Sequence, residues 1–142
     1  MKFIGFNFNK INIEKFSGSL KELKINTKID ISKIEAVKSD LIGNGEGLIM
    51  AKFTYKIIYE PNIANIELNG DVFLSDTPKN IKEIVEQWSN NKEMPEDFRV
   101  FLFNIILRKS NLKALQLEDE MNLPVHIPFP SLKKEKNEKE KK

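Results

Sequence analysis

The sequence predicts an α+β domain, with a four-stranded antiparallel sheet followed by two helices packed on one face of the sheet. Up to residue 74, apolar residues alternate with polar ones, which is the period of a half-buried strand. Beyond residue 78 they recur every three or four residues, which is the period of a helix. Strands that come first and helices that come second are typical of α+β domains. At 142 residues the chain fits one domain with a substantial core.

The first two strands are predicted over residues 2–16 and 23–32. In the first strand, apolar residues fall on even positions at the start and on odd positions later. This change of phase indicates a bend or bulge near Asn9 and Lys10. The second strand alternates cleanly, so one of its faces is expected to be buried. Residues 33–47 carry a weaker apolar signal, and no further strand is predicted there.

A hairpin within residues 48–74 supplies the remaining two strands. Pro61 and Asn62 are good turn residues and are expected to form its tip. With that tip, Tyr59 faces Ala64, and the apolar residues of both strands fall on the same side of the sheet. The turn and the alternation therefore predict one register.

Two helices follow the hairpin. The first is predicted to begin at Pro78 with Thr77 as its N-cap, and it carries one narrow apolar stripe. The second, within residues 95–120, carries two stripes on opposite sides. One stripe holds Phe98, Phe101, Leu102, Ile105 and Leu112, and the other holds Val100, Phe103, Leu107 and Ala114. Because a sheet covers only one side of a helix, we expect the second stripe to meet another subunit.

The composition excludes several kinds of chemistry. The chain has no cysteine, which rules out disulfides and thiol catalysis, and its one histidine, His126, rules out a multi-histidine metal site. His126 has no carboxylate close to it in sequence, and the acidic run at residues 118–120 is expected to be a solvated helix face. The glycine-rich run at residues 43–47 lacks the lysine and hydroxyl of a P-loop. We therefore expect no catalytic residues, no metal and no cofactor, and hence no enzyme.

The charge balance depends on the C-terminal residues 133–142, which hold six lysines and three glutamates. Without this tail, 17 basic residues face 18 acidic ones, so a nucleic-acid partner is not expected. The tail is too polar to pack and is predicted to be disordered. No apolar run is long enough for a membrane span, and the N-terminus lacks a signal-peptide core. We expect a cytoplasmic protein that does not insert into membranes.

Several short segments resemble the SecB family of export chaperones. They are residues 6–11 (FNFNKI), 28–31 (KIDI), 70–73 (GDVF) and 123–128 (LPVHIP), in the same order of four strands and two helices. The resemblance spans residues 3–132, so we assign a single SecB-like domain to residues 1–132. It implies a chaperone that holds unfolded or non-native polypeptides in an extended, export- or folding-competent state through apolar grooves.

The lysine-rich tail differs from the acidic tail with which bacterial members contact the export motor. SecB-like proteins also serve as chaperones for antitoxins. The alternative function is therefore a dedicated interaction module, or antitoxin-type chaperone, that serves one partner.

A holding chaperone must present apolar surface to many sequences. The candidates for client contact are Ile49, Met50, Phe73, Trp88, Phe98 and Phe101. The candidates for a subunit interface are Val100, Phe103 and Leu107. We expect at least a symmetric dimer, and the resemblance implies a dimer of dimers. Ordinary packing in the core or between subunits is the alternative to client contact at each position.

Overall fold

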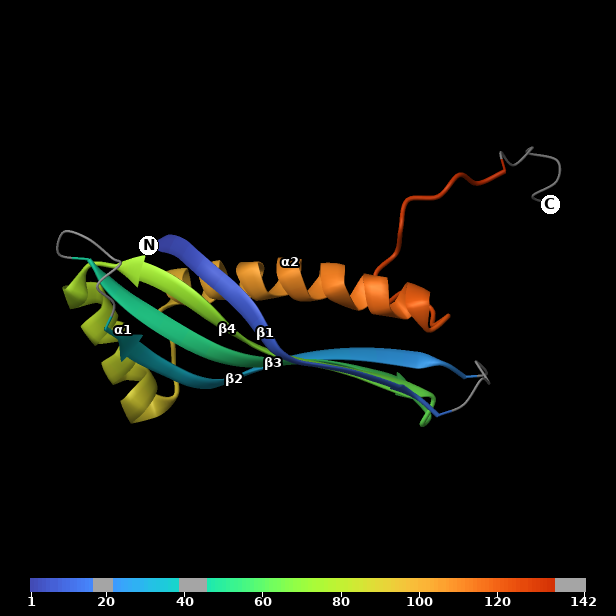
Figure 1. The fold of residues 1–142 in the computed structure, drawn as a ribbon, viewed down its shortest axis with the longest axis horizontal. Helices are drawn as coiled ribbons and strands as arrows, with labels where there is room; N and C mark the ends of the chain where they lie inside the picture. Colours follow the sequence, from blue (N-terminus) through green and yellow to red (C-terminus); the bar gives the residue numbers. More distant parts are fainter. Residues whose placement is uncertain (17–21, 39–45, 135–142) are drawn as a thin grey trace.

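The computed structural model of the protein describes residues 1–16, 22–38 and 46–134. Its elements are β1 (Lys2–Lys15), β2 (Lys24–Val37), β3 (Gly47–Glu60), β4 (Ala64–Asp76), α1 (Pro78–Asn91) and α2 (Glu96–Glu120). The strands form one antiparallel sheet in the order β1-β4-β3-β2 (Figure 1). The predicted fold class is therefore confirmed. The glycine-rich run up to residue 45, and the predicted disordered tail from residue 135, lie outside the described residues.

The hairpin of β3 and β4 has the predicted register. Tyr59 pairs with Ala64, and the pairing continues without a shift to Gly47 and Asp76. Asn62 at the tip has a φ of 49°, a left-handed conformation that asparagine tolerates better than most residues. Odd-numbered residues of β3 and even-numbered residues of β4 are buried beneath the helices. These two central strands supply most of the core.

Strand β1 lies at one edge of the sheet and carries two bulges. Its pairing with β4 shifts between Phe8 and Lys10, which confirms the predicted bulge, and also between Phe3 and Gly5, which the sequence did not indicate. An edge strand has a neighbour on one side only. Accordingly, several of its apolar side chains and that of the next residue remain exposed, namely Phe3, Ile4, Ile11 and Phe16.

Strand β2, at the opposite edge, is longer than predicted. Its pairing with β3 shifts between Ile31 and Lys33, and the strand continues to Val37. The shift moves Ile34 and Ala36 to the helix side of the sheet, opposite Ala51 and Ile49 of β3. The bulge breaks the strict alternation of period two, so the sequence pattern ended the strand too early.

Helix α1 begins as predicted. The Thr77 hydroxyl accepts a hydrogen bond from the Asn80 N–H at 3.3 Å. The helix lies beside the ends of β2 and β3 and buries Ile81 and Ile84. A side chain at Gly47 would come within 2.7 Å of the Ile81 Cδ1 atom, so this glycine lets the helix approach β3 closely.

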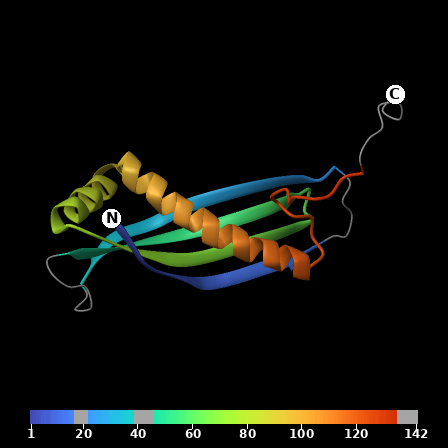
Figure 2. The same ribbon diagram turned by 90° about the horizontal axis from the view of Figure 1, so that it is seen from above.

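Helix α2 crosses the sheet obliquely (Figure 2), and the side that it buries rotates along its length. Its buried residues are Phe98, Leu102, Ile106, Ser110, Ala114, Leu117 and Glu118. Each step of four residues turns the contact by about 40° around the helix axis. The two predicted stripes are therefore wrong near the C-terminal end of the helix. There, Leu112 is 62% exposed and Ala114 is fully buried.

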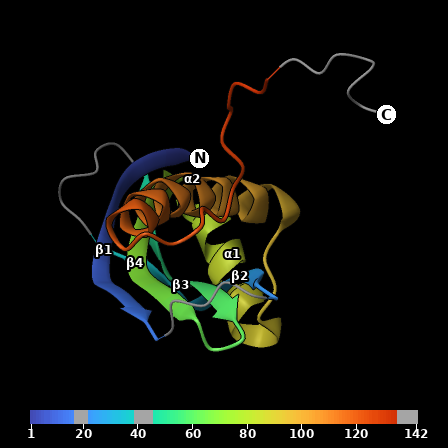
Figure 3. The same cartoon turned by 90° about the vertical axis from the view of Figure 1, so that its right-hand side faces the viewer.

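The chain after α2 turns back over the sheet (Figure 3). We call residues 123–130 the C-terminal strap. It begins at Leu123, whose N–H donates to the Glu118 carbonyl at 2.9 Å and whose side chain joins the core. The strap then reaches β3, where the Tyr59 hydroxyl donates to the Pro124 carbonyl at 2.7 Å. Its three prolines are consistent with this non-helical course.

Candidate functional site

The residues predicted for client contact do not form one continuous surface. Ile49 and Phe98 lie in the core, with exposed fractions of 0% and 3%. Met50 pairs with Phe73, and this pair lies on the sheet face opposite the helices. Met50 is buried and Phe73 is partly exposed. Contact with Ile49 or Phe98 would require the core to open, so client contact at these positions stays a prediction.

Trp88 and Phe101 are the two candidates on the helices that are partly exposed. Both pack against the core on one side. The Lys92 ammonium lies 5.3 Å from the centroid of the Trp88 ring, a cation–π distance. Trp88 therefore already has an intramolecular partner, whereas Phe101 opens onto a pocket.

This pocket lies between α1, the start of α2 and the N-terminus, and its volume is about 450 Å³. Ile84, Phe98 and Phe101 give it apolar walls, and Asp76, Glu83 and Asp97 add three carboxylates. The N-terminal ammonium of Met1 is 3.8 Å from one Asp76 oxygen, so it balances only part of this charge. The lining suits an apolar side chain that has a cation close to it.

A second pocket, of about 350 Å³, lies between α1 and the ends of β2 and β3. Its apolar lining consists of Ala36, Val37, Leu48, Pro78, Ile81 and Val85. The residues of α1 that line it lie on the other side of that helix from those that line the first pocket. The sequence analysis missed this pocket because its residues come from three elements, and none of them stands out singly.

The residues predicted for a subunit interface lie on the side of α2 turned away from the sheet. Val100 is 48% exposed, whereas Phe103 and Leu107 are partly exposed. Phe103 also packs against the edge of the core. A subunit interface at these three residues stays a prediction.

A polar cluster lies on the sheet face opposite the helices. Asp71 accepts hydrogen bonds from Asn9 and from Lys52, each at 3.0 Å, and Asn7 donates to Asn9 at 2.8 Å. Burial alone would raise the pKa of Asp71, but the bonds from Asn9 and Lys52 outweigh it and hold that pKa below its ordinary value. Because Asn9 is the bulged residue of β1, the cluster fastens this bulge to the central strands.

A second polar cluster is buried where the C-terminal strap crosses α2 and β3. The His126 Nδ1 atom is 2.7 Å from Glu118, and the His126 main-chain N–H donates to the other Glu118 oxygen at 3.2 Å. The Nε2 atom of His126 lies 2.9 Å from the Tyr55 hydroxyl and 3.0 Å from the Asn111 Oδ1 atom. The expected solvated face at residues 118–120 is therefore wrong for Glu118, whereas Asp119 and Glu120 are exposed. Sequence reasoning missed the pairing because it joins single residues from different elements.

The tyrosines of this cluster are held in their neutral form. Burial, and then the nearby charge of Glu118, raise the pKa of Tyr55 far above its ordinary value. Burial, and then the proximity of Glu118, also raise the pKa of Tyr59 far above its ordinary value. Both hydroxyls can therefore act as hydrogen-bond donors over the whole physiological pH range.

Neither a metal centre nor a membrane span is found in the part of the chain that the structure describes. Within residues 1–16, 22–38 and 46–134, the His, Asp and Glu side chains nowhere gather in threes in a way that could hold a metal ion. Of the two helices seen in these ranges, neither is long and apolar enough to cross a membrane.

Comparisons with known proteins bear on the fold of the chain. No family model and no curated protein matches the sequence. Among solved structures, the chain is similar to the SecB-like chaperone Rv1957 of Mycobacterium tuberculosis, in complex with a ChAD peptide from the antitoxin HigA1. The TM-score is 0.50 over 95% of this chain and 92% of that chain, at 10% sequence identity. The chain shares the fold of this SecB-like chaperone. At this level of identity, the likeness extends to the fold alone.

Proposed function

We propose that the protein is a SecB-like chaperone that holds unfolded or non-native polypeptides in an extended, export- or folding-competent state. The observation that best supports this is the pocket at Phe101, in which an aromatic side chain of α2 is accessible to a bound polypeptide. The fold points the same way, since the similar chaperone is in complex with a peptide. We further propose that this role is carried out in the cytoplasm, without a catalytic step.

The two pockets beside α1 are of a size that suits single side chains. An aromatic side chain buries roughly 150–250 Å², which at about 25 cal/mol per Å² corresponds to about 4–6 kcal/mol before the cost of ordering the client. One such contact gives weak binding. A client segment that fills both pockets would bind more tightly through the higher effective concentration of its second contact. Weak, repeated contacts of this kind suit a chaperone that must release its clients.

Self-association completes the proposal. Val100, Phe103 and Leu107 on α2 form one candidate interface, and the exposed apolar residues of β1 form another. Two surfaces on one chain are what a dimer of dimers requires, because each closed symmetric contact uses one of them. We therefore propose a homo-oligomer, with a dimer of dimers as the expected form.

A second candidate function is that of a dedicated module for one partner, such as an antitoxin. It is favoured by the peptide of the similar complex, which comes from an antitoxin. Binding of two unrelated unfolded proteins, measured beside the mass of the oligomer, distinguishes the two candidates. A general chaperone binds both proteins with similar affinity. If neither protein binds, the chaperone proposal is wrong, whereas a dedicated module would still bind its own partner.

A further inference from the structure

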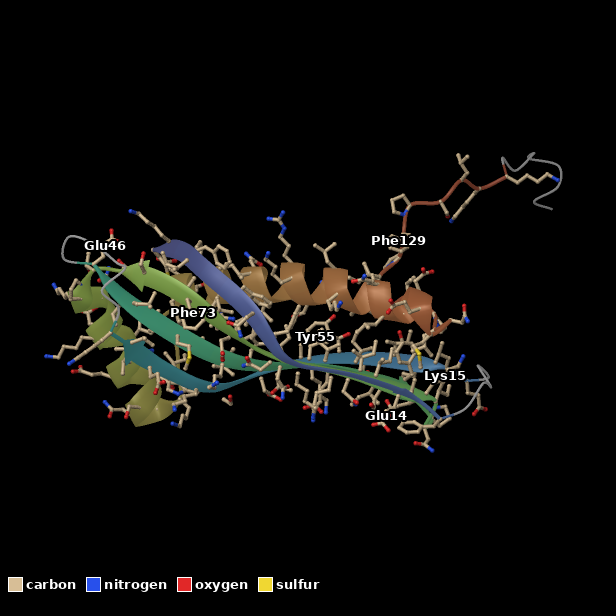
Figure 4. The ribbon with its side chains drawn as sticks, viewed as in Figure 1. Glu14, Lys15, Glu46, Tyr55, Phe73 and Phe129 are labelled. Carbon is tan, nitrogen blue, oxygen red and sulfur yellow. The ribbon has the colours of Figure 1, made fainter. Side chains whose placement is uncertain are left out.

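The C-terminal strap is attached to the rest of the molecule at few points. Leu123 is 6% exposed, and the His126 side chain is 3% exposed. Between and beyond them the strap is loosely packed, since Val125 is 37% and Phe129 is 58% exposed. Figure 4 shows Phe129 above α2, on the segment that leads away from the fold, and Tyr55 between the sheet and α2. A segment with side chains this exposed opens locally at a lower free-energy cost than the core does.

The body of the protein binds the strap partly through the strap's main chain. The Tyr59 hydroxyl donates to the Pro124 carbonyl at 2.7 Å, and Glu118 accepts the His126 N–H at 3.2 Å. Carbonyl and N–H groups are common to almost all residues of any polypeptide. Tyr59 and Glu118 could therefore hold any extended segment that brings these two groups to the same places.

The remaining contacts recognise one side chain. The imidazole of His126 meets Glu118, Asn111 and Tyr55 at 2.7 to 3.0 Å. The Glu118 side chain is 0% exposed, and a carboxylate buried this deeply is costly without donors. When the strap leaves, Glu118 must therefore be hydrated or take hydrogen bonds from another chain. An extended polypeptide supplies such donors.

We propose that Tyr55, Tyr59, Asn111 and Glu118 form a polypeptide-binding site, and that the protein's own C-terminal strap occupies this site. An extended segment of a non-native client displaces the strap and takes its place. The segment that fits has an apolar side chain in the position of Leu123 and a hydrogen-bond donor in the position of His126. This inference rests on the proposed chaperone function and adds to it a competition between the protein's own strap and its clients.

The test compares the full-length wild type with the His126→Ala and Val125→Ala variants. His126→Ala removes the imidazole that holds the strap and leaves the four residues of the binding site unchanged. Val125→Ala is a matched change at an exposed strap position. The first readout is hydrogen exchange at the main-chain N–H groups of the non-proline residues within 123–130. The second is the Kd of a fluorescently labelled, carboxymethylated protein that stays unfolded, measured by fluorescence anisotropy.

We expect faster exchange in His126→Ala and a Kd about three- to tenfold lower than in the wild type, because the open fraction rises. Val125→Ala should change neither quantity. A synthetic peptide that copies residues 122–131 should compete with the labelled protein for the His126→Ala variant. The Asn111→Ala variant removes the contact that α2 makes with the Nε2 atom of His126. It should also make the exchange faster, and it replaces His126→Ala if that variant does not fold.

Three results would overturn the inference. The first is faster exchange without tighter binding, and the second is unchanged exchange in both His126→Ala and Asn111→Ala. The third is a strap peptide that fails to compete. In each case a wild type that still binds the unfolded protein leaves the proposed chaperone function intact. If none of the variants binds the unfolded protein, both proposals fail together.

Discussion

The carboxylate of Glu118 lies 2.7 Å from the imidazole of His126, and both side chains are almost completely buried. Glu118 is in the last turn of α2 and His126 is in the C-terminal strap. This contact therefore ties the strap to the helix, and through Tyr55 it ties both of them to β3. The stability of this end of the molecule should depend on it.

Replacement of Glu118 by alanine should destabilise the fold strongly. It leaves the imidazole and the main-chain N–H of His126 without their acceptor, and a buried donor left without an acceptor costs about 1–3 kcal/mol. Glu120→Ala, at an exposed position in the same helix turn, should change the stability by less than about 0.5 kcal/mol. Urea unfolding followed by circular dichroism measures both. Equal effects of the two changes would contradict a structural role for the Glu118–His126 contact.

Gly70 is required by the close contact between β1 and β4. A Cβ atom at this position would collide with the Asn7 carbonyl and come within 2.8 Å of the Phe53 Cε1 atom. Gly70→Ala should therefore cost about 1–3 kcal/mol. Gly5→Ala is the matched control in β1, because its nearest neighbour would be the Phe73 ring at 4.0 Å. Thermal unfolding should show a clearly lower Tm for Gly70→Ala, and a Tm equal to that of the control would refute this packing.

The Asp71 cluster should make stability depend on acid pH. Because the pKa of Asp71 is lowered in the folded state, its contribution is present above the unfolded value of 3.8 and is lost as the pH falls through the lower folded value. Asp71→Asn removes this pH-dependent contribution to the free energy of unfolding. Between about pH 4 and about pH 2, the wild type should therefore lose more stability than Asp71→Asn. Thermal unfolding at a series of pH values tests this, and parallel curves for the two proteins would contradict it.

The proposed interface on α2 can be tested with a charge at Val100. This residue is 48% exposed, so Val100→Glu should leave the monomer folded. In an interface, however, the new carboxylate would lose its water without gaining a partner, which should weaken the oligomer at least about tenfold. Gln116→Glu, at an exposed position on another side of α2, adds the same charge as a control. Multi-angle light scattering at micromolar concentration reads out the mass. A monomeric wild type would defeat the proposal.

The sheet was predictable because its information is local. A turn at Pro61 and a strict alternation on either side of it leave only one register for β3 and β4. A change of phase revealed the bulge of β1 near Asn9, but prediction failed in β2 and α2, where the period also changes along the element. The bulge in β2 shifted the alternation, and the oblique course of α2 moved its buried side from Phe98 around to Ala114.

The C-terminal strap shows a different limit. His126 pairs with a carboxylate eight residues earlier and with residues of β3 and α2. Such a cluster has no period and no motif, since each element contributes one or two residues. The pockets beside α1 are similar, because their linings come together only after the helices have docked. Tertiary packing, rather than any local pattern, creates both features.

Suppression of aggregation tests the chaperone proposal most directly. Two unrelated proteins are diluted from denaturant, and light scattering is followed with the wild type, Phe101→Asp or Leu112→Asp present. The wild type should suppress the aggregation of both proteins at a near-equimolar ratio. Phe101→Asp should have lost this activity because a carboxylate replaces an aromatic wall of the pocket. Leu112→Asp, at an exposed site outside the pocket, should keep it. A folded wild type that suppresses the aggregation of neither protein would contradict the account.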